Sequence, residues 1–308
     1  MSGTLKIDWR DGEHGIWVVP REPWTPAHTQ RFIELGAAGL SLGAAGWRAA
    51  THETSVAFLR DLVGLRHLLV MPMEGEHDWS VLGELPHLET LWLDIPGLKP
   101  IPDLERLTAI RRLILEWHPG QEQLLMSIPP LAELGIVRWG LADLTALTTH
   151  LTTLQQLHLT SARRITSLGD LEPATTLESL RLTYCTRLNT LEPLSQLTGL
   201  RRLAIDRCGK LSDFSALGTL RNLRALELAN TTIDDLDALR GLPDLEYLSI
   251  DGNVRSGDLS PLLALPALRI LFFQNRKHYS HRVTEIQEAL GLDPAAYPEP
   301  GLRSEEIK

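Results

Sequence analysis

The chain of 308 residues has little cysteine, few aromatic residues and very little lysine. Two cysteines cannot build a disulfide framework, so the fold must depend on a hydrophobic core. Only 5 lysines accompany 25 arginines, a bias typical of GC-rich bacterial genomes, and the net charge is −9. Non-specific nucleic-acid binding depends on cations that neutralise phosphates. We therefore expect no nucleic-acid partner.

Long hydrophobic runs are also absent from the sequence. Leucine recurs at intervals and never fills the roughly 18 consecutive positions of a membrane-spanning helix. The first residues, 1–15, contain no apolar run of the kind found in signal peptides. We therefore expect a cytoplasmic protein with no membrane partner.

Sequence patterns of catalysis are missing as well. There is no glycine-rich phosphate loop, no Gly-x-Ser-x-Gly turn and no His-x-x-x-His pair on a predicted helix. Residues 73–78 and 278–281 contain possible metal donors, but solvated loops are the favoured interpretation of both. We predict a protein that is not an enzyme, with no catalytic residues, no metal and no cofactor.

The chain does contain one sequence motif, Leu-x-x-Leu-x-Leu with variants, repeated ten times. The copies begin at Leu65, Leu88, Ile110, Leu131, Leu154, Leu177, Leu200, Leu223, Leu245 and Leu268. Consecutive copies start 21 to 23 residues apart. A fixed period of roughly 20–29 residues with this motif is typical of leucine-rich repeats. The pattern predicts an α/β leucine-rich repeat solenoid, a curved right-handed horseshoe or arc with a parallel concave sheet and about ten regular repeats.

Two segments, Leu211–Leu217 and Ile233–Leu239, look like the turn into the next coil of one repeat class. This class of 22–23-residue repeats is found in internalins and in the leucine-rich regulatory subunit of a eukaryotic phosphatase. The resemblance covers roughly two thirds of the chain. It implies the solenoid fold and a role in binding other proteins.

The segments beside the repeats are predicted to cap them. Apolar residues alternate on both sides of a turn-rich segment within residues 1–20, which predicts a β-hairpin. Further predicted elements are a helix from Thr25 to Gly36, a strand over 38–42, a helix over 51–62, a C-terminal helix over 284–290 and a frayed tail over 294–308. We divide the chain into an N-terminal cap with a degenerate repeat (1–62), the repeat array (63–276), and a C-terminal cap and tail (277–308).

One position of the repeat, here called the ladder slot, is expected to point its side chain into the core. Cys185 and Cys208 each lie eight residues after the first leucine of their repeats, as do Trp139, Thr231 and Asn253. In leucine-rich repeats this slot forms a ladder of side chains that hydrogen-bond to loop backbone. We predict two buried ladder thiols, and a redox pair is the alternative because neighbouring coils lie about 4.8 Å apart.

Side chains alternate across a strand, so residues beside the inward leucines should lie on the concave face. The candidate partner-binding residues are Leu69, Met71, Trp92, Ile114, Trp117, Arg138, His158, Arg181, Tyr184, Arg202, Arg207, Glu227 and Tyr247. Trp, Tyr and Arg are enriched at binding hot spots. Two alternatives stay open: the cap could cover the apolar residues, and the charges could be ordinary cross-strand pairs.

These observations favour a non-enzymatic protein–protein interaction module that binds a protein partner on its concave face and is monomeric when free. One specialisation is an immunity or inhibitor protein that neutralises a toxin. The alternative is an enzyme or small-ligand sensor with a polar site around His158, Arg181 and Asp206. A scaffold that uses its convex side or its cap is a third class.

Overall fold

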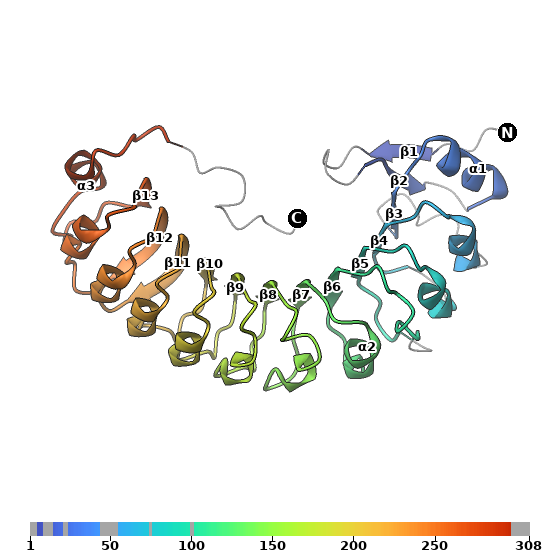
Figure 1. The fold of residues 1–308 in the computed structure, drawn as a ribbon, viewed down its shortest axis with the longest axis horizontal. Helices are drawn as coiled ribbons and strands as arrows, with labels where there is room; N and C mark the ends of the chain where they lie inside the picture. The colour runs from blue at the N-terminus through green and yellow to red at the C-terminus, as the bar shows by residue number, and fades with distance from the viewer. Residues whose placement is uncertain are drawn as a thin grey trace. The chain divides into compact units, whose positions relative to one another are not determined.

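The computed structural model describes residues 5–8 by their backbone, and residues 15–20, 24–43, 55–73, 76–98 and 102–296 in full. The chain divides into two compact units, unit 1 (Met1–Ile136) and unit 2 (Val137–Lys308). The strands and α-helices of each are labelled in Figure 1. The boundaries predicted after residues 62 and 276 stay predictions.

Unit 1 begins with the predicted hairpin, in which β1 (Leu5–Asp8) pairs antiparallel with β2 (Trp17–Pro20). Its turn, residues 9–14, lies outside the described residues. The strands that follow in sheet order are β3 (Gly39–Leu42), β4 (His67–Val70), β5 (Thr90–Leu93), β6 (Arg112–Glu116) and β7 (Glu133–Val137), with parallel pairing from β2 to β6. The helical segments are α1 (Pro26–Glu34), η2 (Val56–Asp61), η3 (Trp79–Glu84) and α2 (Glu122–Ser127).

Helix α1 confirms the predicted start and end of the first helix. The backbone N–H of Thr25 donates to His28 Nδ1 over 3.1 Å, and Pro26 occupies the first helical turn. The helix ends before Gly36, whose φ of 60° is accessible to glycine at little cost.

The helix predicted over 51–62 is instead a short 3₁₀ helix, η2, and residues 51–54 lie outside the described part of the chain. In a 3₁₀ helix, side chains three residues apart lie on the same edge. Val56 and Leu59 have this spacing and both are buried, so the tighter helix places them together in the core.

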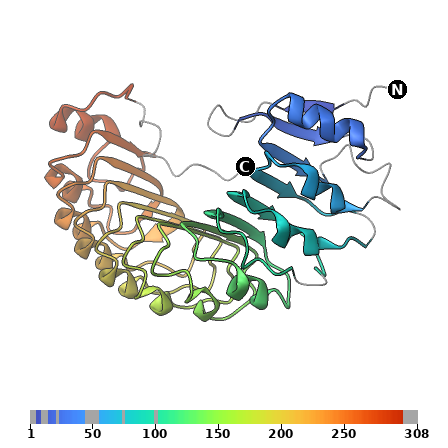
Figure 2. The ribbon, with the colours of Figure 1, turned by 45° about the vertical axis from the view of Figure 1, so that its right-hand side comes forward.

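Unit 2 is a series of parallel strands, each followed by a short helix. Its strands, in sheet order, are β8 (Gln156–Thr160), β9 (Ser179–Thr183), β10 (Arg202–Asp206), β11 (Ala225–Ile233), β12 (Tyr247–Val254) and β13 (Ile270–Phe273). The 3₁₀ helices are η4 (Thr145–Leu147), η5 (Gly169–Leu171), η6 (Glu192–Gln196), η7 (Ser215–Thr219), η8 (Asp237–Gly241) and η9 (Ser260–Ala264). Figure 2 shows these helices stacked on the side of the unit opposite its sheet.

The inward leucines form the core between sheet and helices. Leu157 pairs in register with Leu180, and Leu159 with Leu182, and all four are at most 1% exposed. Replacing one such leucine by alanine costs about 2–5 kcal/mol of stability. Because every coil contributes the same pair, the repeat spacing directly specifies the stacking of the coils.

The predicted ladder is present in unit 2. The Cys185 Sγ lies 3.9 Å from the carbonyl oxygen of Leu159, and the Cys208 Sγ lies 3.7 Å from that of Leu182. Both thiols are free and fully buried. The interaction with Cys208 and burial both raise the pKa of the Cys185 thiol.

Trp139 occupies the same inward slot, as predicted. It is 1% exposed, and its indole N–H donates to the carbonyl oxygen of Asp143 over 2.9 Å. The assignment of Asn253 to this slot is wrong by one residue, because a bulge shifts the register and pairs Asn253 with Thr232.

Helix α3 (Val283–Leu290) closes unit 2 where the C-terminal helix was predicted. It ends at Gly291, whose φ of 66° gives a left-handed cap. Ile286 is fully buried, and the Gln287 amide donates to the carbonyl oxygen of Leu271 over 3.1 Å. These contacts dock the helix on the last coil, whereas tail residues 297–308 lie outside the described part.

Candidate interaction surface

The concave face of a unit is the surface of its sheet that faces away from its helical segments. In unit 2, His158 pairs in register with Arg181, Arg181 with Ala204, and Ala204 with Glu227. His158, Arg181 and Glu227 are half-buried, and so is Arg202 on β10. The structure therefore brings four of the predicted site residues together on four neighbouring strands, β8 to β11.

Tyr184, Arg207 and Asp206 form a second group at the carboxyl edge of unit 2, the edge at which its parallel strands end. The Arg207 guanidinium lies 5.0 Å from the centre of the Tyr184 ring and donates to Asp206 over 2.9 Å. The Asn230 side-chain amide donates to the same carboxylate over 2.8 Å. Tyr184 is 38% exposed, so an aromatic ring and a guanidinium stacked on it face solvent together.

The backbone conformation is unusual at five positions along this edge, four of them directly after β7 to β10 and the fifth within β11. Five non-glycine residues share a φ between 49° and 60°, namely Arg138, Ser161, Tyr184, Arg207 and Asn230. The backbone N–H groups of the first four still bond to the next coil, as from Tyr184 to the carbonyl oxygen of Asp206 over 2.9 Å. The left-handed conformation costs an L-residue about 1 kcal/mol or more, so these four coils maintain it through these neighbouring contacts.

The three residues of the alternative polar site, His158, Arg181 and Asp206, lie on adjacent strands but not all in one row. His158 and Arg181 are opposite each other, but Asp206 pairs in register with Thr183, two residues further along. Its carboxylate accepts bonds from Arg207 and Asn230. The prediction that the three residues lie on adjacent strands is confirmed.

In unit 1, Met71 and Trp92 are half-buried on the concave face. Leu69 and Ile114 were expected to be exposed, and this expectation is wrong because they are 7% and 6% exposed. Trp92 lies between them in the sheet, paired in register with Leu69 on β4 and with Ile114 on β6. The large indole between two strands at about 4.8 Å spacing accounts for their burial.

Trp17 is a concave-face residue of unit 1 that sequence reasoning missed. It pairs in register with Gly39 and stacks on the His67 ring with 5.9 Å between ring centres. A Cβ on Gly39 would lie 2.3 Å from the Trp17 ring, so glycine is required there. The alternating apolar residues of the hairpin were the available signal, because they place Trp17 on the same face as His67.

Trp117 was expected at an exposed strand edge, and this expectation is also wrong, since it is 5% exposed. Its coil is 21 residues long, two fewer than most others. The turn after Trp117 bends back at once, with the backbone N–H of His118 bonded to the Gln121 side chain over 3.0 Å. Trp117 also lacks the left-handed conformation of the later coils and is buried instead.

Tyr247 is the fourth residue whose expected exposure is wrong. It is 3% exposed and packs with Ala225 and Ile270 in a small apolar cluster on β11–β13. Phe272 and Ala296 pack against this cluster. Ala296 belongs to the segment after α3, so chain far away in sequence covers this part of the concave face.

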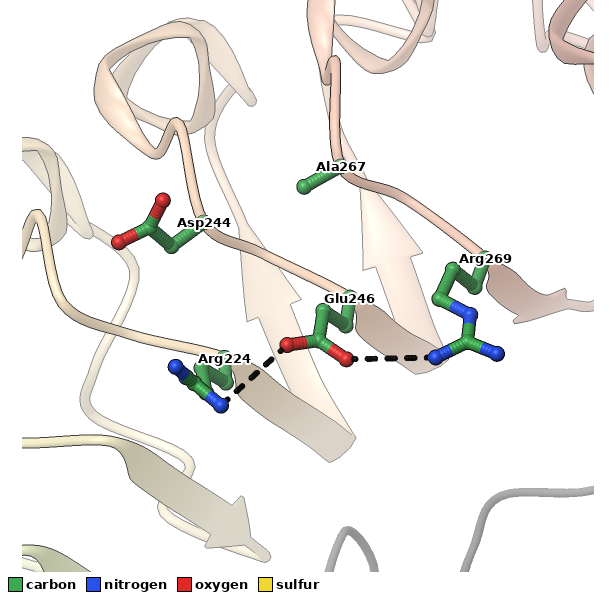
Figure 3. A pocket seen from close by; sticks show the side chains of 5 residues that line it. All are labelled: Arg224, Asp244, Glu246, Ala267 and Arg269. Carbon is green, nitrogen blue, oxygen red and sulfur yellow. Dashed lines mark ion pairs between the residues drawn. The ribbon is translucent and has the colours of Figure 1, made fainter.

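Sequence reasoning also missed a hollow at the opposite, amino edge of unit 2, where its strands begin. Its volume is about 390 Å³, and it is lined by Arg224, Asp244, Glu246, Ala267 and Arg269. Figure 3 shows Glu246 between the two arginines, 3.7 Å from Arg224 and 3.8 Å from Arg269. The hollow is open, and Glu246 pairs with both of its arginines.

Among the described residues, no group of three or more His, Cys, Asp or Glu side chains could hold a metal ion. Residues 278–281 are described and belong to no such group, whereas residues 74–75 of the other candidate lie outside the described chain. No described helix has the length and apolar character needed to cross a membrane.

Two solved structures share this architecture. An internalin (inlF) from Listeria monocytogenes strain 4b F2365 is 20% identical, with a TM-score of 0.57 over 91% of this chain and 85% of that one. The chain is a leucine-rich repeat solenoid. The mouse RP105/MD-1 complex matches with a TM-score of 0.55 and 18% identity, over 82% of this chain and 45% of that one. No protein-family model matches, and no curated protein does.

In this leucine-rich repeat solenoid the predicted surface is therefore smaller than expected. The predicted residues that remain exposed or half-exposed are Met71 and Trp92 in unit 1, and Arg138, His158, Arg181, Tyr184, Arg202, Arg207 and Glu227 in unit 2. The buried exceptions are Leu69, Ile114, Trp117 and Tyr247.

Proposed function

We propose that this chain is a non-enzymatic protein-interaction module that binds a protein partner on its concave face. The observation that most supports this is the placement of Arg181 on the concave face of a regular parallel sheet, with Tyr184 and Arg207 at the adjoining carboxyl edge. Arginine and tyrosine are enriched at interaction hot spots. Their strands are fixed by register pairing and buried leucines, so ordering this surface on binding costs little.

The two structural neighbours are consistent with this proposal. One of them is described as a complex of RP105 with MD-1, so the same fold there is found with a second protein. The alternative of a catalytic or small-ligand site is less favoured, because its Asp206 carboxylate already accepts bonds from Arg207 and Asn230. A thermal-shift screen with metals and nucleotides is the check on that alternative, since a bound ligand raises the unfolding temperature.

Two finer points belong to the same proposal. The free, buried thiols of Cys185 and Cys208 suit a reducing compartment, so we infer a cytoplasmic location. A role as an immunity or inhibitor protein rests on the net charge of −9, which favours association with a basic toxin.

The proposal is tested by affinity capture from a host lysate, read by mass spectrometry. The test variant combines Trp92→Ala, Arg181→Ala and Tyr184→Ala, all at positions that are not fully buried. The matched control combines substitutions away from the concave face at exposed residues: Val63→Ala, Met126→Ala and Arg240→Ala.

We expect one stoichiometric protein to be captured by the wild type and the control, and to be lost from the concave-face variant. Equal capture by all three forms would contradict binding on the concave face. Loss from the control alone would instead indicate the helical side. Circular dichroism of each form establishes that the fold is retained.

A further inference from the structure

The carboxyl edge of unit 2 contains six exposed cations. They follow β7 to β10 and are Arg138, Arg163, Arg164, Arg187, Arg207 and Lys210, here called the basic edge. The chain as a whole has a net charge of −9, so this concentration runs against its overall composition. None of these residues belongs to the inward core of the coils.

Three of the cations stack in one column. Arg164, Arg187 and Lys210 each lie ten residues after the first leucine of their repeats. The loops of the first two coils are in register, since the backbone N–H of Asn189 bonds to the carbonyl oxygen of Thr166, 23 residues earlier. With coils about 4.8 Å apart, three like charges lie within roughly 10 Å. Like charges placed opposite one another destabilise a sheet.

Neighbouring carboxylates do not neutralise this column. Within the described residues, the side chains of Arg163, Arg187 and Lys210 form no hydrogen bond or ion pair, and Arg164 donates to the carbonyl oxygen of Gly140. The acidic side chains nearby already accept hydrogen bonds from other residues. Asp206 binds Arg207 and Asn230, and the Asp143 and Asp213 carboxylates accept bonds from Thr145 and Ser215 at the start of their 3₁₀ turns.

The opposite edge of the same unit shows how this chain neutralises a row of charges. At the amino edge, Arg201 pairs with Glu178 at 3.9 Å. Glu246 lies between Arg224 and Arg269, as seen in the hollow of Figure 3. Opposite signs therefore alternate along the amino edge, whereas the column of Arg164, Arg187 and Lys210 forms no ion pair with a described carboxylate.

We propose that the basic edge of unit 2 binds an acidic segment of a protein partner. The proposal deepens the proposed function by adding a second contact beside the concave face, and it rests on that function. The column is about as long as three extended residues, at 3.3 Å each, so it fits two or three carboxylates of a peptide. Arginine guanidinium groups bind such carboxylates in a bidentate manner.

Two further features favour a peptide over a nucleic acid. The Tyr184 ring with Arg207 stacked on it lies at the same edge and supplies an exposed contact of the kind common in protein interfaces. An extended polyanion would also run beyond the short column and meet the acidic remainder of the chain. The partner needs an acidic segment, not a negative net charge.

The experiment uses the full chain and a fluorescein-labelled peptide with three consecutive glutamates flanked by glycine and serine, followed by fluorescence anisotropy at low salt, about 20 mM, and at about 200 mM. The edge variant combines Arg164→Gln, Arg187→Gln and Lys210→Gln. The control combines Arg201→Gln, Arg224→Gln and Arg269→Gln. Both change the net charge equally, and all six positions are exposed, so both variants should fold.

We expect the wild type to bind the peptide with an affinity that falls as salt rises. The edge variant should bind about tenfold more weakly or worse, and the control should lose less than about threefold. Absence of binding at low salt, or an equal loss in both variants, would overturn the proposal. Tighter binding of a labelled oligouridine through the same three residues would overturn it in favour of nucleic acid.

The two proposals can fail separately. The peptide measurement needs no natural partner, and none of its six substitutions lies in the concave-face variant. If the peptide result is negative while the captured protein depends on Trp92, Arg181 and Tyr184, only the basic edge is lost. If the peptide binds but capture is insensitive to that variant, the concave-face proposal fails instead.

Discussion

Replacing Ser161 by glycine should leave the protein as stable as before or make it more stable. Ser161 has a φ of 57°, in the left-handed region, where an L-residue costs about 1–2 kcal/mol. Glycine removes that cost but raises the conformational entropy of the unfolded chain, an opposing effect of about 0.4–1 kcal/mol. The Ser161 side chain makes no hydrogen bond with other described residues, so little else is lost. The expected net change is a gain of about 0–1 kcal/mol.

The matched control is the residue before it. Thr160 ends β8 in an ordinary strand conformation, so Thr160→Gly incurs the entropy cost without relief of strain, a loss of about 0.5–1 kcal/mol. Ser161→Val should also destabilise, because a branched side chain is poorly tolerated at positive φ. Urea unfolding midpoints of the three variants and the wild type measure these differences.

The reasoning predicts an order of midpoints, with Ser161→Gly at or above the wild type and both other variants below it. If Ser161→Gly lowers the midpoint as much as Thr160→Gly does, the left-handed position stores no strain. The five-coil row at the carboxyl edge would then be a neutral feature of the turn.

Three further predictions follow from local geometry. Gly83→Ala should lower stability by more than about 2 kcal/mol in urea unfolding, because its Cβ would lie 2.0 Å from the backbone oxygen of Asp103. The raised pKa and full burial of Cys185 should leave it unreactive towards an aromatic disulfide reagent at neutral pH, and two thiols should react only after unfolding; rapid reaction of the native protein would contradict this. The hydrogen bond from Arg60 lowers the pKa of Glu84, so this pair stabilises the fold above the ordinary pKa of 4.5 and the effect disappears as pH falls through the lower folded value. Glu84→Gln should therefore lower the unfolding temperature at neutral pH and match the wild type in acid, and a constant difference at all pH values would refute the assignment.

The repeat spacing by itself determined the solenoid, the parallel sheet and the inward leucines. It also placed Cys185, Cys208 and Trp139 in the ladder slot, where they are buried. These features are local, because strand alternation fixes which way a side chain points and the period fixes which residues stack. The hairpin, the caps of α1 and the left-handed end of α3 also follow from short sequence signals.

Only the tertiary structure decided which concave-face residues stay accessible. Leu69 and Ile114 point as predicted but are covered beside Trp92, and Tyr247 is covered by Phe272 and Ala296. Exposure depends on neighbours from other coils and from distant segments, which a repeat pattern does not specify. The ion pairing of the two edges of unit 2 is decided in the same way, because it depends on which side chains meet across coils.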